Sequence, residues 1–567
     1  MGTVMTPTLR YGAMARNGFD DGLRYITLAP VAGVVGLAIV AKDPHGLLGG
    51  KGSEGITVAL LDRDHPGLRI GDRHDPLAAS FMNGTVEGED VFIPLSQLIG
   101  GQTRTCQGWS MLMDCLAEGR GISLPALSVA AAKGTVASIG AYARIRQQFK
   151  VPLAELEGVQ EHLARIGGET YVVTAGQHLT NAMLNNHEQP PVITAILKQQ
   201  ATERMRRVIN DGMDVAAGSA ICKGPSNYLG AAYQLVPIGI TVEGANTLTR
   251  SLIQYGQGLM RSHPHLLDLV RAIQHGDDEA GFATHLRLLA AHGLANMLRS
   301  GTRALTRSRG DAGAAGGAAA LAHYESQLSR LSAAFAFCAD VSLSLGGSIK
   351  FREMLSGRYA DALSSLYLGH AVLWYHAQHG DTVEGCDRLL EFAMTNLLRE
   401  VEDALFGVFA NFPIRPLGWL MRGVCFPTGR CYSVPPSDKL KREVARLISS
   451  DSAVRSLLLQ GTFVSRDPSD RVALTLATLP KAIAADALLT ALRKERRAPT
   501  EDEQAVIDEA EAAREVIIQV DSFPRLGAEL AQPASWTADN RPALDPLPSP
   551  VALSAEGGAP TSSRKFA

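Results

Sequence analysis

The chain has 567 residues, of which 46% are hydrophobic and 20% charged, and its formal net charge at pH 7 is −3. This is the composition of a globular protein with a large core, and its length suits two to four domains. A near-neutral charge excludes a general attraction to nucleic acid. The seven cysteines contain no Cys-x-x-Cys pair, which argues against a zinc module or a disulfide framework and favours a reducing compartment.

Residues 24–100 are typical of a β-sheet. The segments "YITLAPVAGVVGLAIVAK" and "GITVALLDRD" are β-branched and apolar, and Gly, Asn and Pro turns separate the shorter strands that follow. The longest apolar run, residues 29–41, is too short to cross a bilayer. We interpret it as a buried strand with a turn near Gly33 or Gly36. The first residues lack the pattern of a signal peptide.

Four long helices with short connections follow the predicted sheet and indicate a helix bundle. Ser123 and Pro125 are expected to open the first helix. The predicted helices cover residues 123–149, 157–186, 193–220 and 241–261.

The rest of the chain is predicted to be helical up to about residue 515. A Gly/Ala segment at 308–320 is expected to form a surface loop. The predicted fold class is therefore mainly α with a small β domain. We divide the chain into a β domain (1–104), a four-helix bundle (105–266), a helical extension (267–529) and a disordered, Pro-rich tail (530–567).

One carboxylate, Glu243 in "ITVEGANTLTR", has two interpretations. An acidic residue in the first turn of a helix complements the helix dipole, and the residue types alone favour this structural role. The preceding "PIGITV" is apolar, however, and burial there would raise the carboxyl pKa. A raised pKa suits a catalytic base, so both interpretations stay open at this point.

A metal site is not expected from the sequence. His263 and His265 in "SHPH" are the nearest approach to one, but no Asp, Glu or Cys stands near them at ligand spacing.

The order and spacing of several motifs resemble the acyl-CoA dehydrogenase family. They are "YITLAPVA", "GRGISLPAL", "GAYARIRQQF", "EGVQEHLARIGG", "TVEGANTLTR" and "YGQGLMRSHP", with "GGSIKFRE" and "FPTGRCYSVPPSDKL" in the extension. The resemblance is strongest to the long bacterial fatty-acid β-oxidation form with a C-terminal extension. It implies a partial acyl-CoA dehydrogenase fold, because the family's N-terminal helical domain is expected before residue 24 and is missing.

The resemblance assigns catalysis to Glu243, in "Val-Glu-Gly-Ala" where the family has Tyr-Glu-Gly-Thr. The family's glutamate removes the α-proton of an acyl-CoA while a hydride passes from the β-carbon to N5 of FAD, giving a trans-2-enoyl-CoA. Its backbone N–H donates a hydrogen bond to the thioester carbonyl. Gly244 lets the thioester approach the backbone, and Arg120 corresponds to the arginine that helps to hold CoA.

The resemblance also assigns a set of residues to FAD. Arg146 and Phe149 correspond to an Arg-x-x-Phe that reaches the cofactor of the partner subunit, where the Arg fork suits pyrophosphate. Asp214 stands where the family often has Gln, and Ala245 replaces a flavin-contacting Thr. The implied cofactor-binding residues are Thr27, Arg146, Phe149, Asp214, Gly218, Ala245 and Thr247.

The function implied by the resemblance is dehydrogenation of medium- or long-chain acyl-CoA in β-oxidation, with FAD as cofactor. An electron-transferring flavoprotein is the implied electron acceptor, and a homodimer the implied assembly. The expected location is the cytoplasm, with contact of the extension with the inner membrane allowed. The alternative is a truncated, non-catalytic module that dimerises and binds flavin weakly.

Overall fold

The computed structural model describes residues 8–9, 13–14, 23–41, 55–188, 190–275, 279–306 and 318–524. The predicted tail at 530–567 and most of the Gly/Ala segment lie outside these residues.

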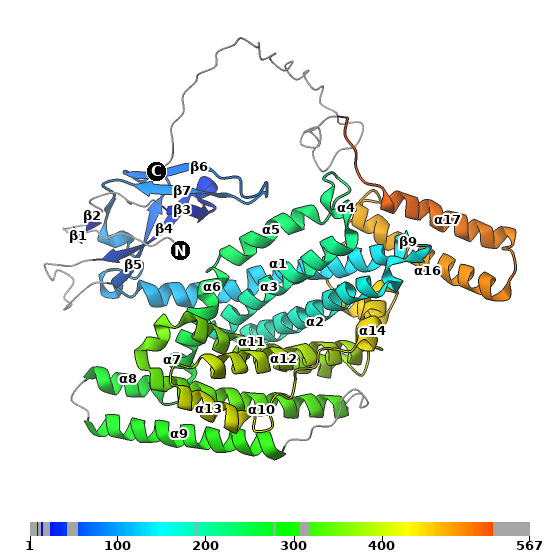
Figure 1. The fold of residues 1–567 in the computed structure, drawn as a ribbon. Coiled ribbons are helices and arrows are strands. Elements are labelled where there is room, and N and C mark those ends of the chain that lie inside the picture. The colour runs from blue at the N-terminus through cyan, green and yellow to red at the C-terminus, as the bar shows by residue number, and fades with distance from the viewer. Residues whose placement is uncertain are drawn as a thin grey trace, which may run out of the picture.

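A small β region precedes the helices and confirms the predicted sheet (Figure 1). β4 (Val34–Ala41) and β5 (Gly55–Asp62) form an antiparallel ladder, and β3 (Leu23–Thr27), β7 (Asn83–Gly88) and β6 (Leu68–Arg73) form a second sheet in that order. Short strands β1 (Thr8–Leu9), β2 (Ala13–Met14) and β8 (Phe92–Ile93) form a third. The predicted turn falls at Gly33, whereas Gly36 lies within β4.

Three long helices pack against one another next to this β region. They are α1 (Gly108–Ile145), α2 (Glu157–Asn185) and α3 (Pro191–Ala216). The α2 prediction is confirmed. The predicted start of α1 is wrong, because Pro125 lies inside a helix that begins at Gly108. Proline removes one main-chain hydrogen bond, and the packing of α1 along both halves offsets that loss.

The fourth predicted helix, over residues 241–261, begins later in the structure. Its residues form α6 (Asn246–Leu248), the π-helix η5 (Thr249–Gln257) and α7 (Gly258–Ser262), which follow one another directly, whereas α4 (Gly218–Ile221) and α5 (Gly230–Thr241) precede the loop that carries Glu243. Glu243 and Gly244 have φ values of 56° and 89°, in the left-handed region. A right-handed helix cannot pass through such residues, so the predicted continuous helix over 241–261 is wrong.

The remaining helices extend the same core. Bundle residues such as Leu163 and extension residues such as Leu389 belong to one buried cluster, and α11 and α14 both pack on α2. The helices are α8 (Leu266–His275), α9 (Glu279–Thr306), α10 (Ala318–Ser342), α11 (Glu353–His379), α12 (Cys386–Asn411), α13 (Arg415–Cys425), α14 (Asp438–Ser449), α15 (Ala453–Leu459), α16 (Arg471–Glu495) and α17 (Glu501–Ile518).

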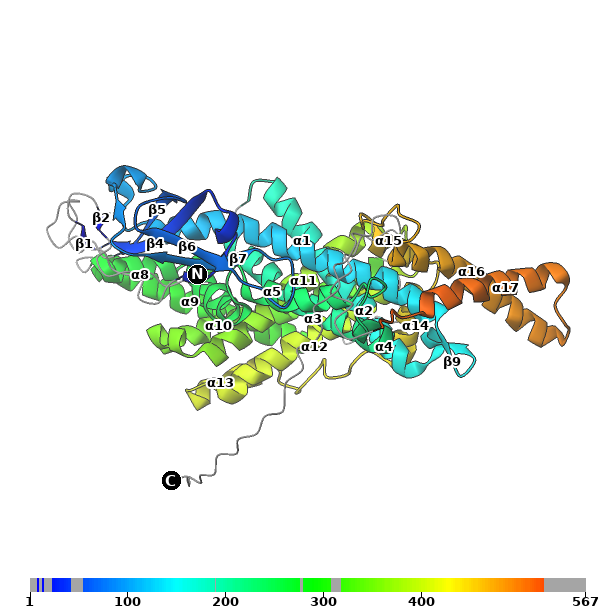
Figure 2. The same ribbon diagram turned by 90° about the horizontal axis from the view of Figure 1, so that it is seen from above.

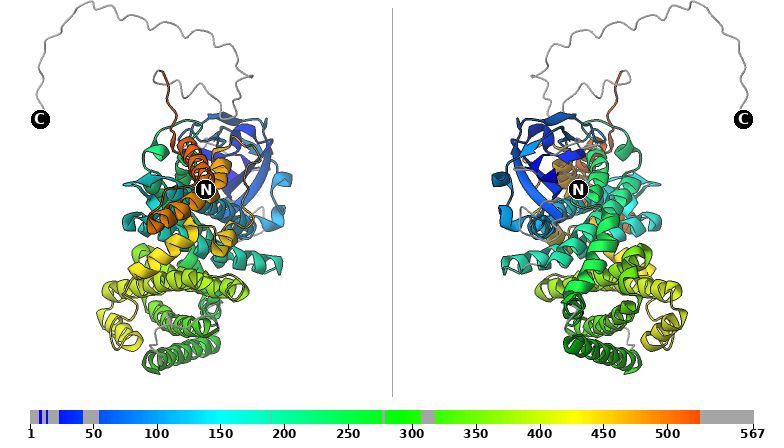
Figure 3. Two further views of the ribbon diagram at one scale, coloured as in Figure 1. Left: turned by 90° about the vertical axis from the view of Figure 1, so that its right-hand side faces the viewer. Right: turned by 90° about the vertical axis from the view of Figure 1, so that its left-hand side faces the viewer.

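The β region and the α16–α17 pair lie at opposite ends of the molecule, with α1 running between them (Figure 2). Seen from either end, α8, α9 and α10 lie beneath the bundle helices, on the side away from the sheets (Figure 3). The fold class is therefore mainly α with a small β domain, as predicted. The domain limits stay a prediction.

Within the described part of the chain, three helical stretches are long and apolar enough to cross a membrane, judged by length and composition alone. They are Gly119–Ile145, Ala318–Phe351 and Arg471–Glu495, whose most apolar windows are 61%, 33% and 28% buried within the protein. The first is thus packed largely inside the bundle.

Candidate active site

Glu243 lies in a short loop, residues 242–245, between α5 and α6. It stands two positions before Ala245, the N-cap of α6, so it is not in the first helical turn. The flanking α5 is also less buried than its apolar sequence indicates. Only Val236 and Gly239 of α5 are buried, because α5 packs on α3 through one face and leaves the other open. The Glu243 side chain is itself exposed in this chain.

A buried arginine holds the backbone of Glu243. Arg120 of α1 is only 4% exposed, and its Nε donates a hydrogen bond to the Glu243 carbonyl oxygen at 3.1 Å. The structure therefore brings together two residues that lie far apart in the sequence and that the resemblance assigns to substrate binding and catalysis. It places the Arg120 guanidinium on the main chain of the loop.

A buried lysine holds the same loop from α3. The Lys198 side chain is fully buried, and its Nζ donates to the Gly244 carbonyl oxygen and to Asn246 Oδ1, both at 2.8 Å. Asn246 in turn donates through Nδ2 to Thr202 Oγ1 and to Glu203 Oε1, each at 2.9 Å. We name Arg120, Lys198 and Asn246 the loop clamp, since together they hold the main chain at Glu243 and directly after it.

The sequence analysis missed Lys198 and Asn246. The available signal was a lysine within the apolar stretch "ITAILKQQ", at a position where a charge needs a partner to be buried.

The clamp perturbs the ionisation of its members. Partial burial raises the pKa of the Glu243 carboxyl, and the positive charges of Lys198 and Arg120 oppose that rise. Burial lowers the pKa of Lys198 to about 8, against the attraction of Glu243. Burial also lowers the pKa of Arg120. The site thus pairs a carboxylate that accepts a proton more readily than usual with two desolvated cations.

Gly244 occupies a backbone conformation that favours glycine. Its φ is 89°, and a Cβ at this position would lie 3.2 Å from Thr249 Oγ1. The Thr249 hydroxyl also donates to the Gly244 carbonyl oxygen at 3.2 Å. A side chain at 244 would strain the loop that carries Glu243. The π-helix η5 follows directly, and such helices are frequent at functional sites.

Three further residues are predicted near the flavin ring. Two of them lie in or next to the Glu243 loop, and the third lies in the β region. Ala245 and Thr247 are exposed at the start of α6. Thr27 is the exposed last residue of β3, paired in the sheet with Asn83. Among the described residues, no hydrogen bond joins β3 to the Glu243 loop.

The other predicted cofactor residues lie at the far end of the bundle. Arg146 is the C-cap of α1, and Phe149 is 88% exposed in the turn that follows. Asp214 is exposed near the end of α3. Gly218 begins α4, and a Cβ there would meet no atom within 4 Å. At 1.5 Å per residue, Arg146 lies roughly 40 Å along the helix from Arg120. One dinucleotide in one chain cannot reach both ends.

Comparison with family models gives two adjoining matches. Residues 106–257 match the model described as "Acyl-CoA dehydrogenase, C-terminal domain", and residues 260–519 match "Acyl-CoA dehydrogenase, C-terminal, bacterial type".

Curated relatives and solved structures give partial matches. The chain is 37% identical over 147 residues to "Protein HemX" of Proteus mirabilis, covering 22% of this chain and 86% of that protein. It is 30% identical over 211 residues to "Probable acyl-CoA dehydrogenase YngJ" of Bacillus subtilis, covering 36% of this chain and 53% of that protein. A crystal structure of an acyl-CoA dehydrogenase complexed with FAD from Bacillus anthracis shares the fold, with a TM-score of 0.58 and 16% identity, covering 78% of this chain and 72% of that one.

Proposed function

The chain belongs to the acyl-CoA dehydrogenase family, and from this premise we propose that it oxidises the Cα–Cβ bond of an acyl-CoA with FAD, giving a trans-2-enoyl-CoA. The observation that carries the proposal is the loop clamp. Two buried cations and Asn246 hold the main chain at Glu243 and directly after it, while Glu243 itself stays exposed to a substrate.

Glu243 acts as the base that takes the α-proton of the thioester. Its raised pKa, caused by partial burial, makes it a better proton acceptor than an ordinary glutamate. Its carbonyl oxygen is fixed by Arg120, so the orientation of its peptide is set before substrate arrives. The Glu243 N–H serves as a donor to the thioester carbonyl, where negative charge develops as the proton leaves.

The residues predicted to bind FAD lie in two places, near the Glu243 loop and near Arg146 at the end of α1, and both sets suit the cofactor. In the described structure the Arg146 guanidinium has no carboxylate partner, Phe149 is exposed, and the space at Gly218 is open. An unpaired guanidinium fork is suited to pyrophosphate oxygens. Asp214 is exposed at the same end as Gly218. Thr27, Ala245 and Thr247 are exposed at the other end, where Glu243 lies. FAD, when bound, supplies the hydride acceptor.

Because the two ends are too far apart for one cofactor, we propose a homodimer in which each FAD spans residues of both chains. Arg146, Phe149, Asp214 and Gly218 then face the cofactor held near Glu243 of the partner subunit. The exposure of Phe149 and of Ile221 (74%) supports an interface at this end.

The finer assignments rest on the family resemblance. The chain spans about half the length of YngJ, so substrate and partners remain proposals. We propose medium- or long-chain acyl-CoA as substrate in β-oxidation, an electron-transferring flavoprotein as acceptor, and a cytoplasmic protein with peripheral contact at the inner membrane.

Anaerobic titration of the purified, FAD-loaded chain with acyl-CoA thioesters of increasing chain length tests the proposal. We expect the visible flavin absorbance to bleach. In Glu243→Gln we expect FAD to stay bound and the rate of bleaching to fall at least a thousandfold, since the amide cannot accept the proton. Glu501→Gln, at an exposed first-turn glutamate of α17, is the matched control and should bleach normally.

Bleaching of Glu243→Gln at the normal rate would remove Glu243 from catalysis. A wild-type chain that stays colourless when FAD is added would favour the alternative, a non-catalytic dimerising module.

A further inference from the structure

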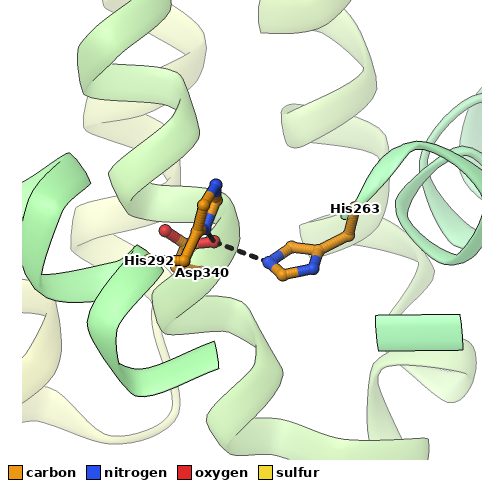
Figure 4. Close-up of side chains that lie close together, drawn as sticks. All are labelled: His263, His292 and Asp340. Atoms are coloured by element: carbon orange, nitrogen blue, oxygen red, sulfur yellow. Dashed lines mark hydrogen bonds and ion pairs between the residues drawn. The ribbon is translucent and has the colours of Figure 1, made fainter. Parts of the chain in front are cut away.

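A second cluster of reactive side chains lies where the bundle meets the extension. His263 stands between α7 and α8, His292 on α9 and Asp340 on α10 (Figure 4). His263 Nε2 lies 3.1 Å and His292 Nδ1 lies 3.2 Å from the same oxygen, Asp340 Oδ1. The three ligand atoms lie within 4.8 Å of one another. Two histidines from separate segments therefore converge on one carboxylate oxygen of α10.

These distances match the spacing of ligands around a tetrahedral metal ion. With metal–nitrogen and metal–oxygen bonds of about 2.0–2.2 Å, ligand atoms in a tetrahedron lie roughly 3.3–3.5 Å apart. Two of the three pairs are already close to that separation. The His263 and His292 rings lie 4.8 Å apart at 70° to each other, as two imidazoles do when they approach a common centre from different sides.

No lysine or arginine among the described residues pairs with the Asp340 carboxylate. Its side chain is 9% exposed, and its ion-pair partners there are these two histidines. Asn296 donates to Asp340 Oδ2 at 2.8 Å, which orients the carboxylate but brings no charge. A carboxylate buried in this way, with two ring nitrogens facing one of its oxygens, favours a bound cation.

We propose that His263, His292 and Asp340 bind a divalent transition-metal ion of the zinc class. Two imidazoles and one carboxylate are the ligand types that Zn²⁺ takes, whereas Mg²⁺ and Ca²⁺ need more oxygen ligands than this site offers. His292 is 30% exposed, which gives an ion a way in. The His265 ring lies 6.2 Å and 5.9 Å from the other two rings and is the nearest fourth ligand.

Metal binding at His263 Nε2 requires a change of tautomer. His263 Nδ1 accepts the backbone N–H of His265 at 3.2 Å, so in the metal-free protein His263 carries its hydrogen on Nε2 and points it at Asp340. An ion at Nε2 takes the place of that hydrogen, which moves to Nδ1 of the same ring, and the contact with the His265 amide opens.

The bound ion would join α9 and α10 of the extension to the end of the bundle at α7. The site is independent of FAD and of the proposed function. Its role is to fix the extension, so metal should raise the melting temperature of the chain.

The test is calorimetric titration of Zn²⁺ into the full-length, chelator-treated protein, with Co²⁺ absorption as a second measurement. We expect one saturable site per chain and an intense visible Co²⁺ band. His292→Ala and Asp340→Asn should each weaken Zn²⁺ binding at least tenfold and abolish the band. His285→Ala, on the same helix but outside the cluster, is the control and should bind like wild type.

His292→Ala is expected to stay folded, because this side chain is partly exposed and its removal opens no large cavity. Circular dichroism without metal checks that the variant is folded. The absence of a one-to-one site in wild type, or unchanged affinity in His292→Ala, would overturn the proposal.

Discussion

Two arginines of α1 lie in opposite environments. Arg120, in the first half of the helix, is 4% exposed and donates to the backbone of Glu243, and Lys198 supports the same loop. Arg146 caps the C-terminal end of the helix without a carboxylate partner among the described residues, beside the exposed Phe149. The Arg120 side chain thus has a main-chain partner within the chain, whereas the Arg146 guanidinium has no carboxylate there.

This difference shows how a binding role and a positioning role can be separated in a structure. Buried cations with main-chain acceptors fix the geometry of the backbone that they contact. An arginine without a carboxylate partner, next to an exposed aromatic ring, keeps its hydrogen bonds available. We therefore propose that the clamp positions the base and that the Arg146 end binds the cofactor.

After the loss of Glu243 itself, the largest effect is expected when the clamp is broken. Lys198→Met leaves Asn246 Oδ1 without its donor and the Gly244 carbonyl with only the Thr249 hydroxyl, so the loop shifts and the rate of flavin bleaching should fall about a hundredfold. Lys133→Met is the matched control, since Lys133 is also buried and donates to a carbonyl, that of Gln460. Both variants should melt earlier than wild type. Equal bleaching rates in the two would show that Lys198 is only structural.

A smaller effect concerns Arg146. Arg146→Gln removes the free guanidinium, and the loss of a charge-assisted hydrogen bond, worth about 1.5–3 kcal/mol, should weaken FAD binding roughly ten- to a hundredfold. Arg144→Gln, two residues earlier and paired with Glu155 at 2.5 Å, is the control. Fluorescence titration with FAD measures both. Unchanged affinity in Arg146→Gln would leave the far end without a cofactor role.

The rate of bleaching should depend on pH through the pKa of Glu243, on which Lys198 of the loop clamp acts. Burial raises the pKa of Glu243, so the base becomes protonated, and the rate falls, at a higher pH than for an ordinary glutamate. The positive charge of Lys198 lowers that pKa, so in Lys198→Met the acid limb should move to still higher pH. A limb that moves to lower pH, or not at all, would show that Lys198 does not act on the Glu243 charge.

The smallest effect is expected at the ion pair between Arg250 and Asp361. Arg250 Nε lies 2.6 Å from Asp361 Oδ1, which joins η5 to α11, and both side chains are about one-third exposed. Asp361→Asn should cost about 1 kcal/mol or less in the free energy of unfolding. FAD affinity and the rate of bleaching should not change, because in this account Arg250 only joins η5 to α11. A loss of FAD would move Arg250 into the site.

Local patterns in the sequence were enough to predict the β region and α2. The start of α1 was misplaced, because Pro125 was taken as a first-turn residue although the packing of the helix tolerates it inside. The break at Glu243 was missed, since a positive φ at a non-glycine residue leaves no pattern in the sequence. Lys198, His292 and Asp340 come together with their partners only through tertiary packing, which spacing along the chain cannot reveal.

The measurement that tests the account most directly is complementation between two inactive chains. Glu243→Gln and Arg146→Gln are co-expressed with different tags, and the mixed dimers are purified through both tags and assayed at an FAD concentration that leaves Arg146→Gln unloaded. If each cofactor spans two chains, a mixed dimer has one of its two sites with both wild-type residues, and its activity should be roughly half that of the wild-type dimer. Activity no higher than that of either variant alone would contradict the assignment of Glu243 and Arg146 of one chain to different sites.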